Sequence, residues 1–274
     1  MTHDKHLTYT SYLKVDELLN LQKPLSDGPE HDELLFITIH QVYELWFKQI
    51  LHEIEALQVA LESNQTHYSL ALLGRVRTIM KTCVSQLDIL ETMTPLQFNS
   101  FRERLSSASG FQSAQFRELE AVLGRRDKAG DGSDQSTGMG MSEHLSPGSE
   151  ARARVEQAMS RKSLWHSALE YFNFKSAMPE GAMKIDPTVA WESNPEVQKV
   201  LIELHRNDPE ANLIGEALID LDEGLQEWRY RHVKMVERTI GRKIGSGGSS
   251  GAGYLASTLF NPVFPDLWEI RSQF

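Results

Sequence analysis

The sequence predicts an all-α protein, and three observations carry this prediction. Apolar residues recur at helical spacing over long stretches, and the longest, from about residue 32 to 62, contains no glycine or proline. Turn-forming clusters such as Asp27-Gly28-Pro29 separate these stretches. No alternating apolar and polar pattern of strand length appears. We therefore expect one helical bundle, a single domain formed by residues 1–274.

Further helices are expected in order along the chain. The second covers about 68–91. The third begins at Thr94-Pro95-Leu96-Gln97, where a capping threonine, a proline at the first helical position and a glutamine three places after the cap stand together. Three more are expected over roughly 151–174, 194–205 and 210–239. The last of these ends at Gly241, because glycine suits a helix C-terminus.

The helical pattern is lost between about 125 and 150, where the chain turns to glycine, serine, aspartate and methionine. Such a composition is typical of a domain linker or of a mobile surface excursion within one domain. We favour the excursion, because the candidate site residues lie on both sides of it.

Charge and cysteine content exclude several classes of protein. The formal net charge of −10 argues against binding to nucleic acid or to an anionic membrane, which needs clustered lysine and arginine. The single Cys83 excludes disulfide scaffolds and cysteine zinc sites. The N-terminal residues lack the apolar core of a signal peptide, and no stretch approaches the roughly 18 apolar residues of a membrane span. We expect a cytoplasmic protein.

Two histidines fall within long amphipathic helix patterns, on a face where histidine is unusual. Residues four apart share a helix face, which places Phe36 beside His40 and Trp228 beside His232. Either histidine alone is more often a core residue bonded to a backbone carbonyl. Together, on two helices, they indicate a buried site.

Arg102 is the third candidate, at the end of the helix that begins near Thr94. Phe98 precedes it by four residues and shares its face. An arginine alone is more often solvent-facing or structurally paired. With the two histidines it predicts a site for a metal or haem and for a substrate that bears a carboxylate.

Sequence motifs narrow the metal chemistry. The chain has no Glu-x-x-His, no His-Glu-x-x-His and no Cys-x-x-Cys-His, which counts against carboxylate di-iron bundles, zincins and covalent c-type haem. Non-covalent haem remains, because one axial histidine on a helix is enough to hold its iron.

The segment 243–255, KIGSGGSSGAGYL, is rich in glycine and serine. It lacks the GxGxxG spacing and the Lys-Ser/Thr ending of nucleotide-binding loops. A flexible linker is one interpretation. We favour a mobile loop that closes over a ligand and offers it backbone N–H groups and hydroxyls.

Five segments in order carry a family resemblance: LTYTSYL (7–13), HDELLF…HQ…ELW (31–46), FRERLSSASGFQS (101–113), WRYRH (228–232) and GSGGSSG (245–251). Over nearly its whole length, except about 125–150, the chain resembles the tryptophan 2,3-dioxygenase family. These haem enzymes open the indole ring of L-tryptophan to N-formyl-L-kynurenine. The resemblance implies haem b, active in the ferrous state, and O2 as co-substrate.

The resemblance assigns roles to the candidate residues. His232 matches the axial ligand of the haem iron, and His40 matches the distal histidine that faces the indole N–H. Arg102 matches the arginine that grips the substrate carboxylate, for which its planar fork is suited. Phe36 and Phe98 match residues that line the indole pocket, and some bacterial members have tyrosine in place of Phe98.

Other matched positions lie around these. Ser109 and Gly110 fall at the haem edge, and Trp228 is expected beside the cofactor. Ser246 stands where many members have threonine in contact with the amino-acid end of the substrate, so a hydroxyl is kept and a methyl is lost.

Tyr9 and Tyr12 match N-terminal residues that reach into a neighbouring subunit's site. This match implies a homotetramer. Ordinary amphipathic packing is the alternative explanation for the two tyrosines.

The expected function is thus cleavage of the indole C2–C3 bond of L-tryptophan, or of a close derivative, with O2. One alternative is a relative that inserts a single oxygen into a tryptophan derivative and forms an oxindole in secondary metabolism. A remote alternative is a non-catalytic haem or tryptophan sensor, which would not need a complete oxygen-facing pocket.

Overall fold

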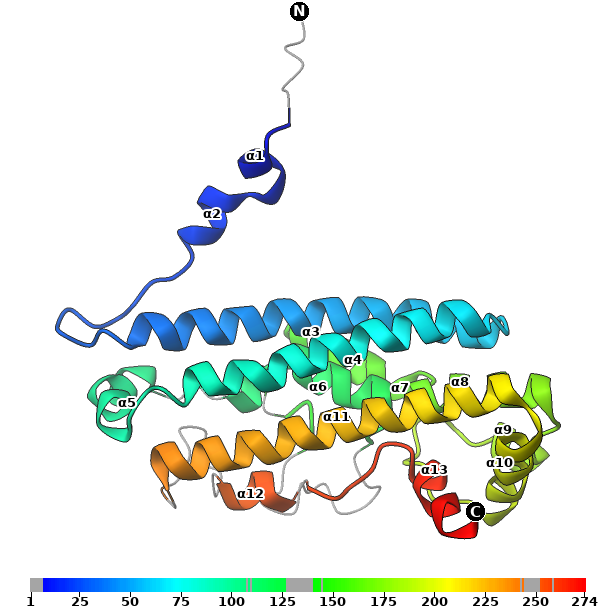
Figure 1. Cartoon of the computed structure of the whole chain (residues 1–274). Coiled ribbons are helices and arrows are strands. Elements are labelled where there is room, and N and C mark those ends of the chain that lie inside the picture. The colour runs from blue at the N-terminus through cyan, green and yellow to red at the C-terminus, as the bar shows by residue number, and fades with distance from the viewer. Residues whose placement is uncertain are drawn as a thin grey trace, which may run out of the picture.

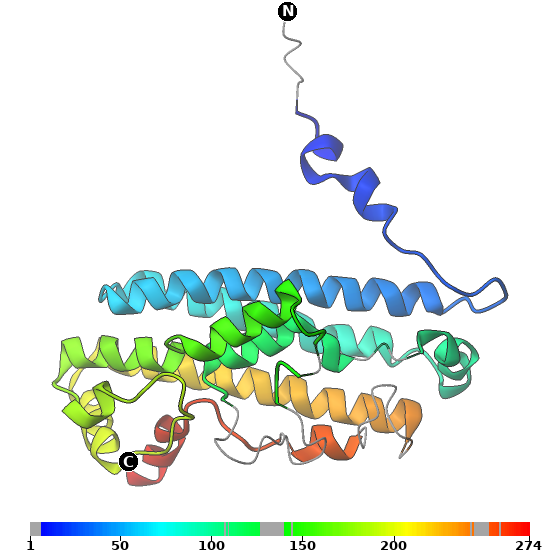
Figure 2. The same ribbon diagram turned by 180° about the vertical axis from the view of Figure 1, so that it is seen from behind.

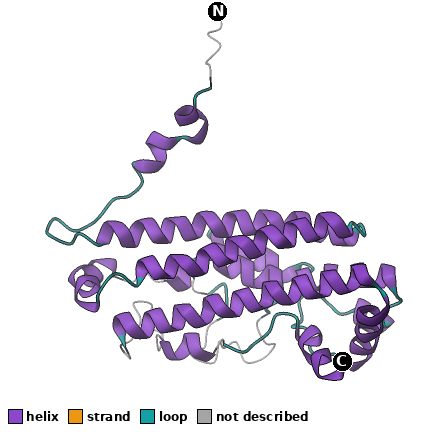
Figure 3. Ribbon diagram, viewed as in Figure 1, coloured by secondary structure: helices purple, strands orange, loops and turns teal. Residues whose placement is uncertain are grey.

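The computed structural model describes residues 7–106, 108, 110–126, 140–143, 145–241, 243, 252–257 and 259–274. Every regular element among these residues is a helix, which confirms the predicted all-α class (Figure 3). None of the described helices is long and apolar enough to span a membrane.

Three long helices form the body of the molecule: α3 (Glu33–Glu62), α4 (Thr66–Leu90) and α11 (Pro209–Ile240). Helix α4 packs against both of the others, and all three run along the length of the bundle (Figure 1). The sequence predicted their ends to within two residues. Local chemistry explains this accuracy for α11, because the Asp208 side chain accepts from two backbone N–H groups at its start. Gly241, with φ of 63°, follows its end.

Shorter helices surround this body. They are α1 (Tyr9–Leu13), α2 (Val15–Leu19), α5 (Pro95–Arg102), α6 (Ala114–Leu123), α7 (Glu150–Ser160), α8 (Leu164–Lys175), α9 (Glu180–Met183), α10 (Pro195–Asn207), α12 (Ala252–Ser257) and α13 (Pro265–Glu269), with short 3-10 turns at Glu103–Leu105, Gly110–Gln112 and Ile270–Gln273. Helices α6 and α7 cover the back of the bundle, where α6 packs on α3 (Figure 2).

The prediction of one helix over 151–174 was wrong, because the chain breaks there into α7 and α8. Arg161 and Ser163 have extended backbone conformations. The backbone N–H of Ser163 donates to Nδ1 of His166, at 3.3 Å, so a new helix starts at Leu164. Serine at this position competes for backbone hydrogen bonds and favours a helix start over a helix interior.

The predicted surface excursion at 125–150 falls largely outside the described residues. Two of its described residues, Met141 and Leu145, are buried in the hydrophobic core. This part of the segment therefore packs against the body, because its two large apolar side chains gain free energy when they leave water.

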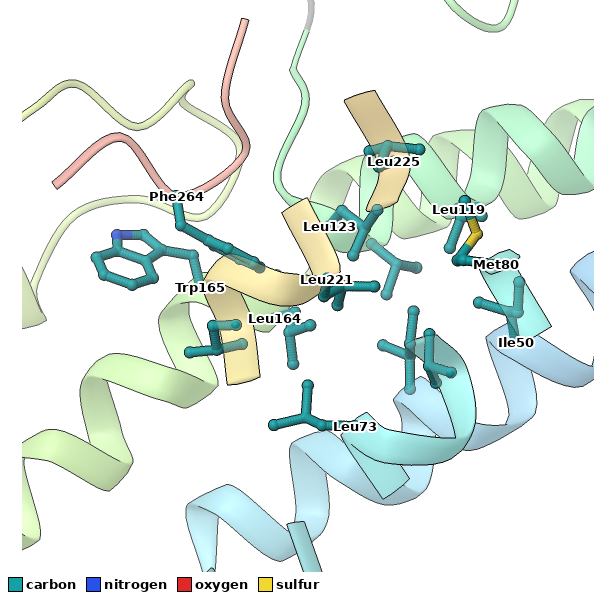
Figure 4. Packing of buried hydrophobic residues seen from close by; sticks show 14 of the residues in the cluster. Ile50, Leu73, Met80, Leu119, Leu123, Leu164, Trp165, Leu221, Leu225 and Phe264 are labelled. Atoms are coloured by element: carbon teal, nitrogen blue, oxygen red, sulfur yellow. The ribbon is translucent and has the colours of Figure 1, made fainter. Parts of the chain in front are cut away.

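The core lies where α3, α4, α6, α8 and α11 meet (Figure 4). Trp165 of α8 and Phe264, just before α13, are fully buried at one end of it, with ring centroids 5.7 Å apart. The buried Asp222 of α11 ties down the segment at Phe264. Its Oδ2 accepts from the backbone N–H groups of Val263 and Phe264 and from Nε1 of Trp268, at 2.8, 3.1 and 2.9 Å.

Helices α1 and α2 form an N-terminal arm, residues 7–20, that projects from the body (Figure 1). Neither helix of the arm buries a residue. Its exposed apolar side chains are those of Leu7, Tyr9, Tyr12, Leu13, Leu18 and Leu19. So much apolar surface on an isolated arm is typical of a segment that packs against another chain.

Candidate functional site: a cavity between two histidines

A cavity of about 520 Å³ lies between α3, α5, α6 and the C-terminal half of α11. The sequence-predicted residues that line it are Phe36, His40, Phe98, Arg102, Gly110, Trp228 and His232. They come from segments far apart in the sequence, so the fold brings together candidates that sequence spacing alone could not relate.

His40 stands on the α3 wall of this cavity, surrounded by protein but open to the cavity space. Its Nδ1–H donates to the backbone carbonyl of Phe36 at 2.7 Å, which leaves Nε2 as the acceptor of a neutral ring. Burial lowers the pKa of His40, and this effect outweighs the hydrogen bond to Phe36, which raises it. His40 therefore presents an unprotonated nitrogen at neutral pH.

Aromatic rings beside His40 form an apolar surface. The Phe36 ring lies 4.1 Å from the His40 ring, measured between centroids. The ring centroids of Phe36, Phe98 and Phe101 lie 5.5–5.7 Å from one another. Such distances are typical of packed aromatic groups and suit a flat aromatic ligand.

The start of α5 fixes the position of Arg102, which lines the cavity. The Thr94 hydroxyl accepts from the backbone N–H of Gln97, and the Gln97 side chain accepts from the backbone N–H of Thr94. Pro95 fits the first turn. Arg102 then falls one turn after Phe98 and places a guanidinium group next to the aromatic surface.

His232 stands on the α11 wall. Its ring is stacked on that of Trp228, one turn earlier, with centroids 5.1 Å apart and an interplanar angle of 19°. Trp228 is itself packed against Phe116 of α6, at 4.8 Å. Burial, and secondarily the nearby His40, lowers the pKa of His232 to about 4. His232 is therefore a neutral imidazole, the form that ligates a metal.

The donor set around His232 fits haem. Among the residues that the structure describes, no group of three or more histidine, cysteine, aspartate or glutamate side chains is arranged to hold a metal ion. One axial imidazole on a helix is what non-covalent haem requires of the protein, and His232 offers one. The cavity's largely apolar lining suits a porphyrin.

Two of the predicted residues do not line this cavity, and two more lie outside the described residues. Tyr9 and Tyr12 belong to the N-terminal arm and are 77% and 71% exposed in the single chain. Ser109 and Ser246 lie outside the described residues.

Sequence reasoning missed four charged residues of the cavity wall: Glu44 of α3, Arg117 and Glu120 of α6, and Arg229 of α11. The helix at 114–123 was not predicted, so nothing placed its charged residues near the histidines. Two signals were available: Arg229 lies three residues before His232, and Glu44 lies four residues after His40, so each is near the face of its histidine.

Comparison with known proteins gives one consistent result. The family model of tryptophan 2,3-dioxygenase matches residues 2–161 and 195–274. The chain is 55% identical to a protein named tryptophan 2,3-dioxygenase from Herpetosiphon aurantiacus, over 97% of this chain and 98% of that protein. A protein of the same name from Anaeromyxobacter sp. (strain K) is 53% identical, with 98% and 97% covered. One from Caulobacter vibrioides is 40% identical, with 97% and 98% covered.

The fold and the cavity define a class: an all-α protein with a mostly apolar pocket that has one histidine on the α11 wall, a second on the α3 wall and an arginine on α5. Within that class, the chain belongs to the tryptophan 2,3-dioxygenase family.

Proposed function

We propose that this protein is a haem-dependent dioxygenase that cleaves the indole C2–C3 bond of L-tryptophan with O2 to give N-formyl-L-kynurenine. One observation carries the proposal. His40, Arg102 and His232 stand on three different helices and line one cavity. The names of the relatives, which cover almost the whole chain, support the choice of tryptophan and O2.

His232 would hold the iron of haem b. When bound, the ferrous haem supplies the binding and activation of O2. The protein's part is to keep the imidazole neutral, which burial does, and to fix the ring's orientation through the stacked Trp228. Gly110 lines the same cavity without a side chain, and contacts of Ser109 and Gly110 with the haem edge remain predictions.

The substrate's two ends match two walls of the cavity. Arg102 supplies a planar guanidinium for the carboxylate. Phe36 and Phe98 supply the apolar surface for the indole ring. The neutral His40, with Nδ1–H donated to Phe36, offers Nε2 as an acceptor for the indole N–H. These contacts orient the indole C2–C3 bond, and orientation in a dry pocket is the protein's main contribution to the rate.

The active assembly proposed here is a homotetramer. The apolar N-terminal arm supports it, because Tyr9 and Tyr12 are largely exposed in the single chain. In the assembly, these tyrosines would reach a neighbouring subunit's cavity. Ser246 would contact the amino-acid end of the substrate, and a cytoplasmic location stays a prediction.

The alternatives from the sequence are not favoured. The relatives at 53–55% identity are named as dioxygenases, which supports insertion of two oxygen atoms over one. A sensor is disfavoured because the cavity keeps both histidines and the arginine.

The test is mass spectrometry of the product formed from L-tryptophan and 18O2 by the reduced, haem-loaded protein. Two labelled oxygen atoms in a ring-opened product are expected. One labelled oxygen with an intact ring system would instead identify an oxindole-forming enzyme. Absence of turnover with L-tryptophan and with ring- or side-chain-substituted tryptophans would leave the sensor.

A further inference from the structure

Residues 21–32, called the linker below, join the N-terminal arm to the first long helix, α3. The linker contains Pro24 and Pro29 and forms no helix. It leaves the body at the end of the bundle where α5 lies, and the arm points away from the body beyond it (Figure 1). The direction of the arm therefore depends on how the linker is held.

Glu33, the first residue of α3, holds one part of the linker. Its carboxylate accepts from the backbone N–H of Leu25 at 2.7 Å, from the backbone N–H of Ser26 at 2.9 Å, and from the Ser26 hydroxyl. Only 2% of Glu33 is exposed. Burial raises the pKa of its carboxyl, but the three hydrogen bonds outweigh burial, so the pKa lies below its ordinary value. Glu33 is thus a buried, ionised acceptor that faces the linker.

Gln41 holds a second part of the linker, eight residues further along α3. Its side-chain oxygen accepts from the side-chain amide of Gln22, and its side-chain nitrogen donates to the backbone carbonyl of Leu21 at 3.3 Å. Eight residues span about 12 Å along a helix axis. Two attachments this far apart fix the direction of the linker, whereas a single attachment would let it pivot.

A third contact of the linker is weaker than these. Glu30 lies 3.6 Å from Arg104, whose side chain is 41% exposed, so solvent screens this ion pair. Glu33 is the strongest of the three attachments, because it is buried and accepts three hydrogen bonds from neighbouring residues.

A fixed linker matters because the arm has apolar surface to bury against another chain. Helices α1 and α2 bury no residue, and Tyr9 and Tyr12 are largely exposed. A pivoting arm would meet a neighbouring subunit in few of its orientations, and association would have to supply the free energy of ordering it. A linker that is already held in one direction lowers this cost.

We propose that Glu33 is a positioning residue for tryptophan binding: by fixing the linker, it sets the direction in which the arm carries Tyr9 and Tyr12 to the cavity of a neighbouring subunit. The inference rests on the proposed homotetramer. Glu33 does not line the cavity of its own chain, so its effect on the substrate passes through the arm.

The experiment uses the full-length, haem-loaded protein. Wild type is compared with Glu33→Gln, with Asp32→Asn, with an arm variant that carries Tyr9→Ala and Tyr12→Ala, and with the arm variant that also carries Glu33→Gln. Glutamine keeps the size of Glu33, but it loses the charge and turns an NH2 group towards N–H donors. Asp32→Asn is the matched control, because Asp32 is the neighbouring acid and takes no part in the hydrogen bonds to the linker.

The KM for tryptophan should rise about three- to tenfold in Glu33→Gln while kcat changes by less than about twofold, because fewer arms stand in the binding-competent orientation. Asp32→Asn should keep the wild-type KM. In the arm variant, Glu33→Gln should change KM by less than about twofold, since the side chains that Glu33 positions are already gone. A local disturbance of α3 would instead raise KM by the same factor with and without the two tyrosines.

Hydrogen exchange of the haem-free protein tests the linker without turnover. Peptides from residues 21–31 should exchange faster in Glu33→Gln than in wild type or Asp32→Asn, because the backbone N–H groups of Leu25 and Ser26 lose their charged acceptor. Far-UV circular dichroism checks folding, and Ser26→Ala replaces Glu33→Gln if the latter does not fold.

Four results overturn the inference: an unchanged KM in Glu33→Gln, an equal rise in Asp32→Asn, a rise that persists in full in the arm variant, or unchanged exchange of the linker. If the arm variant keeps the wild-type KM, or wild type sediments as a monomer, this inference and the proposed role of the arm are both wrong. The proposed chemistry is judged separately, by the labelled product that wild type forms.

Discussion

The two halves of α11 share one apolar period, yet the inward-facing side chains of one half pack into the core and those of the other line the cavity. In the N-terminal half, Ile214, Leu218 and Leu221 are almost fully buried and pack into the core. In the C-terminal half, Trp228, His232 and other inward-facing residues line the cavity.

The difference arises from the neighbours of each half. The N-terminal half packs against α4, α10 and the C-terminal segment that Asp222 holds. The C-terminal half borders the cavity, whose lining also includes aromatic residues of α3 and α5. An apolar period thus identifies the inward face of a helix, but it does not say whether that face meets protein or a ligand. Substitutions in the two halves should therefore separate stability from ligand binding.

The largest effect is expected at the ligand-facing half. His232→Ala should lower haem affinity by more than about 100-fold, because even an outer-shell partner of a metal ligand is worth about 10- to 100-fold. A Soret titration measures this, and far-UV circular dichroism should show an intact fold. A Soret band retained at wild-type affinity would rule out His232 as the iron ligand.

The packed half should respond in the opposite way. Leu218→Ala is expected to lower the free energy of unfolding by about 2–5 kcal/mol, because a fully buried leucine leaves a cavity in a close-packed core. Urea unfolding of the haem-free protein provides the number. Haem affinity of the folded fraction should stay at the wild-type value, and a loss comparable to that of His232→Ala would refute the division between the halves.

Arg102→Ala tests the cavity wall opposite α11. The KM for tryptophan should rise about 10- to 100-fold, since a charge-assisted hydrogen bond to the substrate carboxylate is lost. Haem binding should not change. Arg104→Ala is the matched control, because Arg104 lies two residues further on, pairs with Glu30 and does not line the cavity. Equal KM values in the two variants would remove Arg102 from the substrate site.

His40→Ala should have a smaller effect. We expect kcat/KM to fall about tenfold, the cost of one neutral hydrogen bond, with clear residual turnover. The reason is that His40 orients the indole N–H and is not required to remove its proton. Complete loss of turnover with normal tryptophan binding would show that His40 has a chemical role.

The acid stability of the haem-free protein should depend on two buried groups, His232 and Glu120. His232 has a pKa of about 4, below its ordinary 6.5, so between these values the unfolded chain binds a proton that the folded chain does not. Stability should therefore fall as pH falls from 6.5 to 4. Glu120, with a pKa of about 2 against 4.5, stabilises the fold above pH 4.5, and this contribution is lost between pH 4.5 and 2.

Urea unfolding at a series of pH values separates the two windows. His232→Gln should reduce the loss of stability between pH 6.5 and 4 only in part. The rest remains because burial also lowers the pKa values of His40, His166 and His205. Glu120→Gln should reduce the loss of stability between pH 4.5 and 2 only in part, because the pKa values of Glu33 and Glu210 are also lowered. If the free energy of unfolding of His232→Gln falls as steeply between pH 6.5 and 4 as that of wild type, this would contradict the lowered pKa of His232.

The sequence by itself determined the helical class, the extents of α3, α4 and α11, and the start of α5, because periodicity and capping chemistry act over a few neighbouring residues. It also pointed to His40, Arg102 and His232 as one candidate site, through unusual residues on apolar helix faces and through a family resemblance.

Only the tertiary structure decided that these residues share a cavity and that Arg117, Glu120 and Arg229 belong to its wall. Residues 117 and 229 stand on helices far apart in the sequence. The ion pair of Arg229 with Glu120 is a long-range contact, and such contacts depend on how helices pack, a property that no local pattern of residues records.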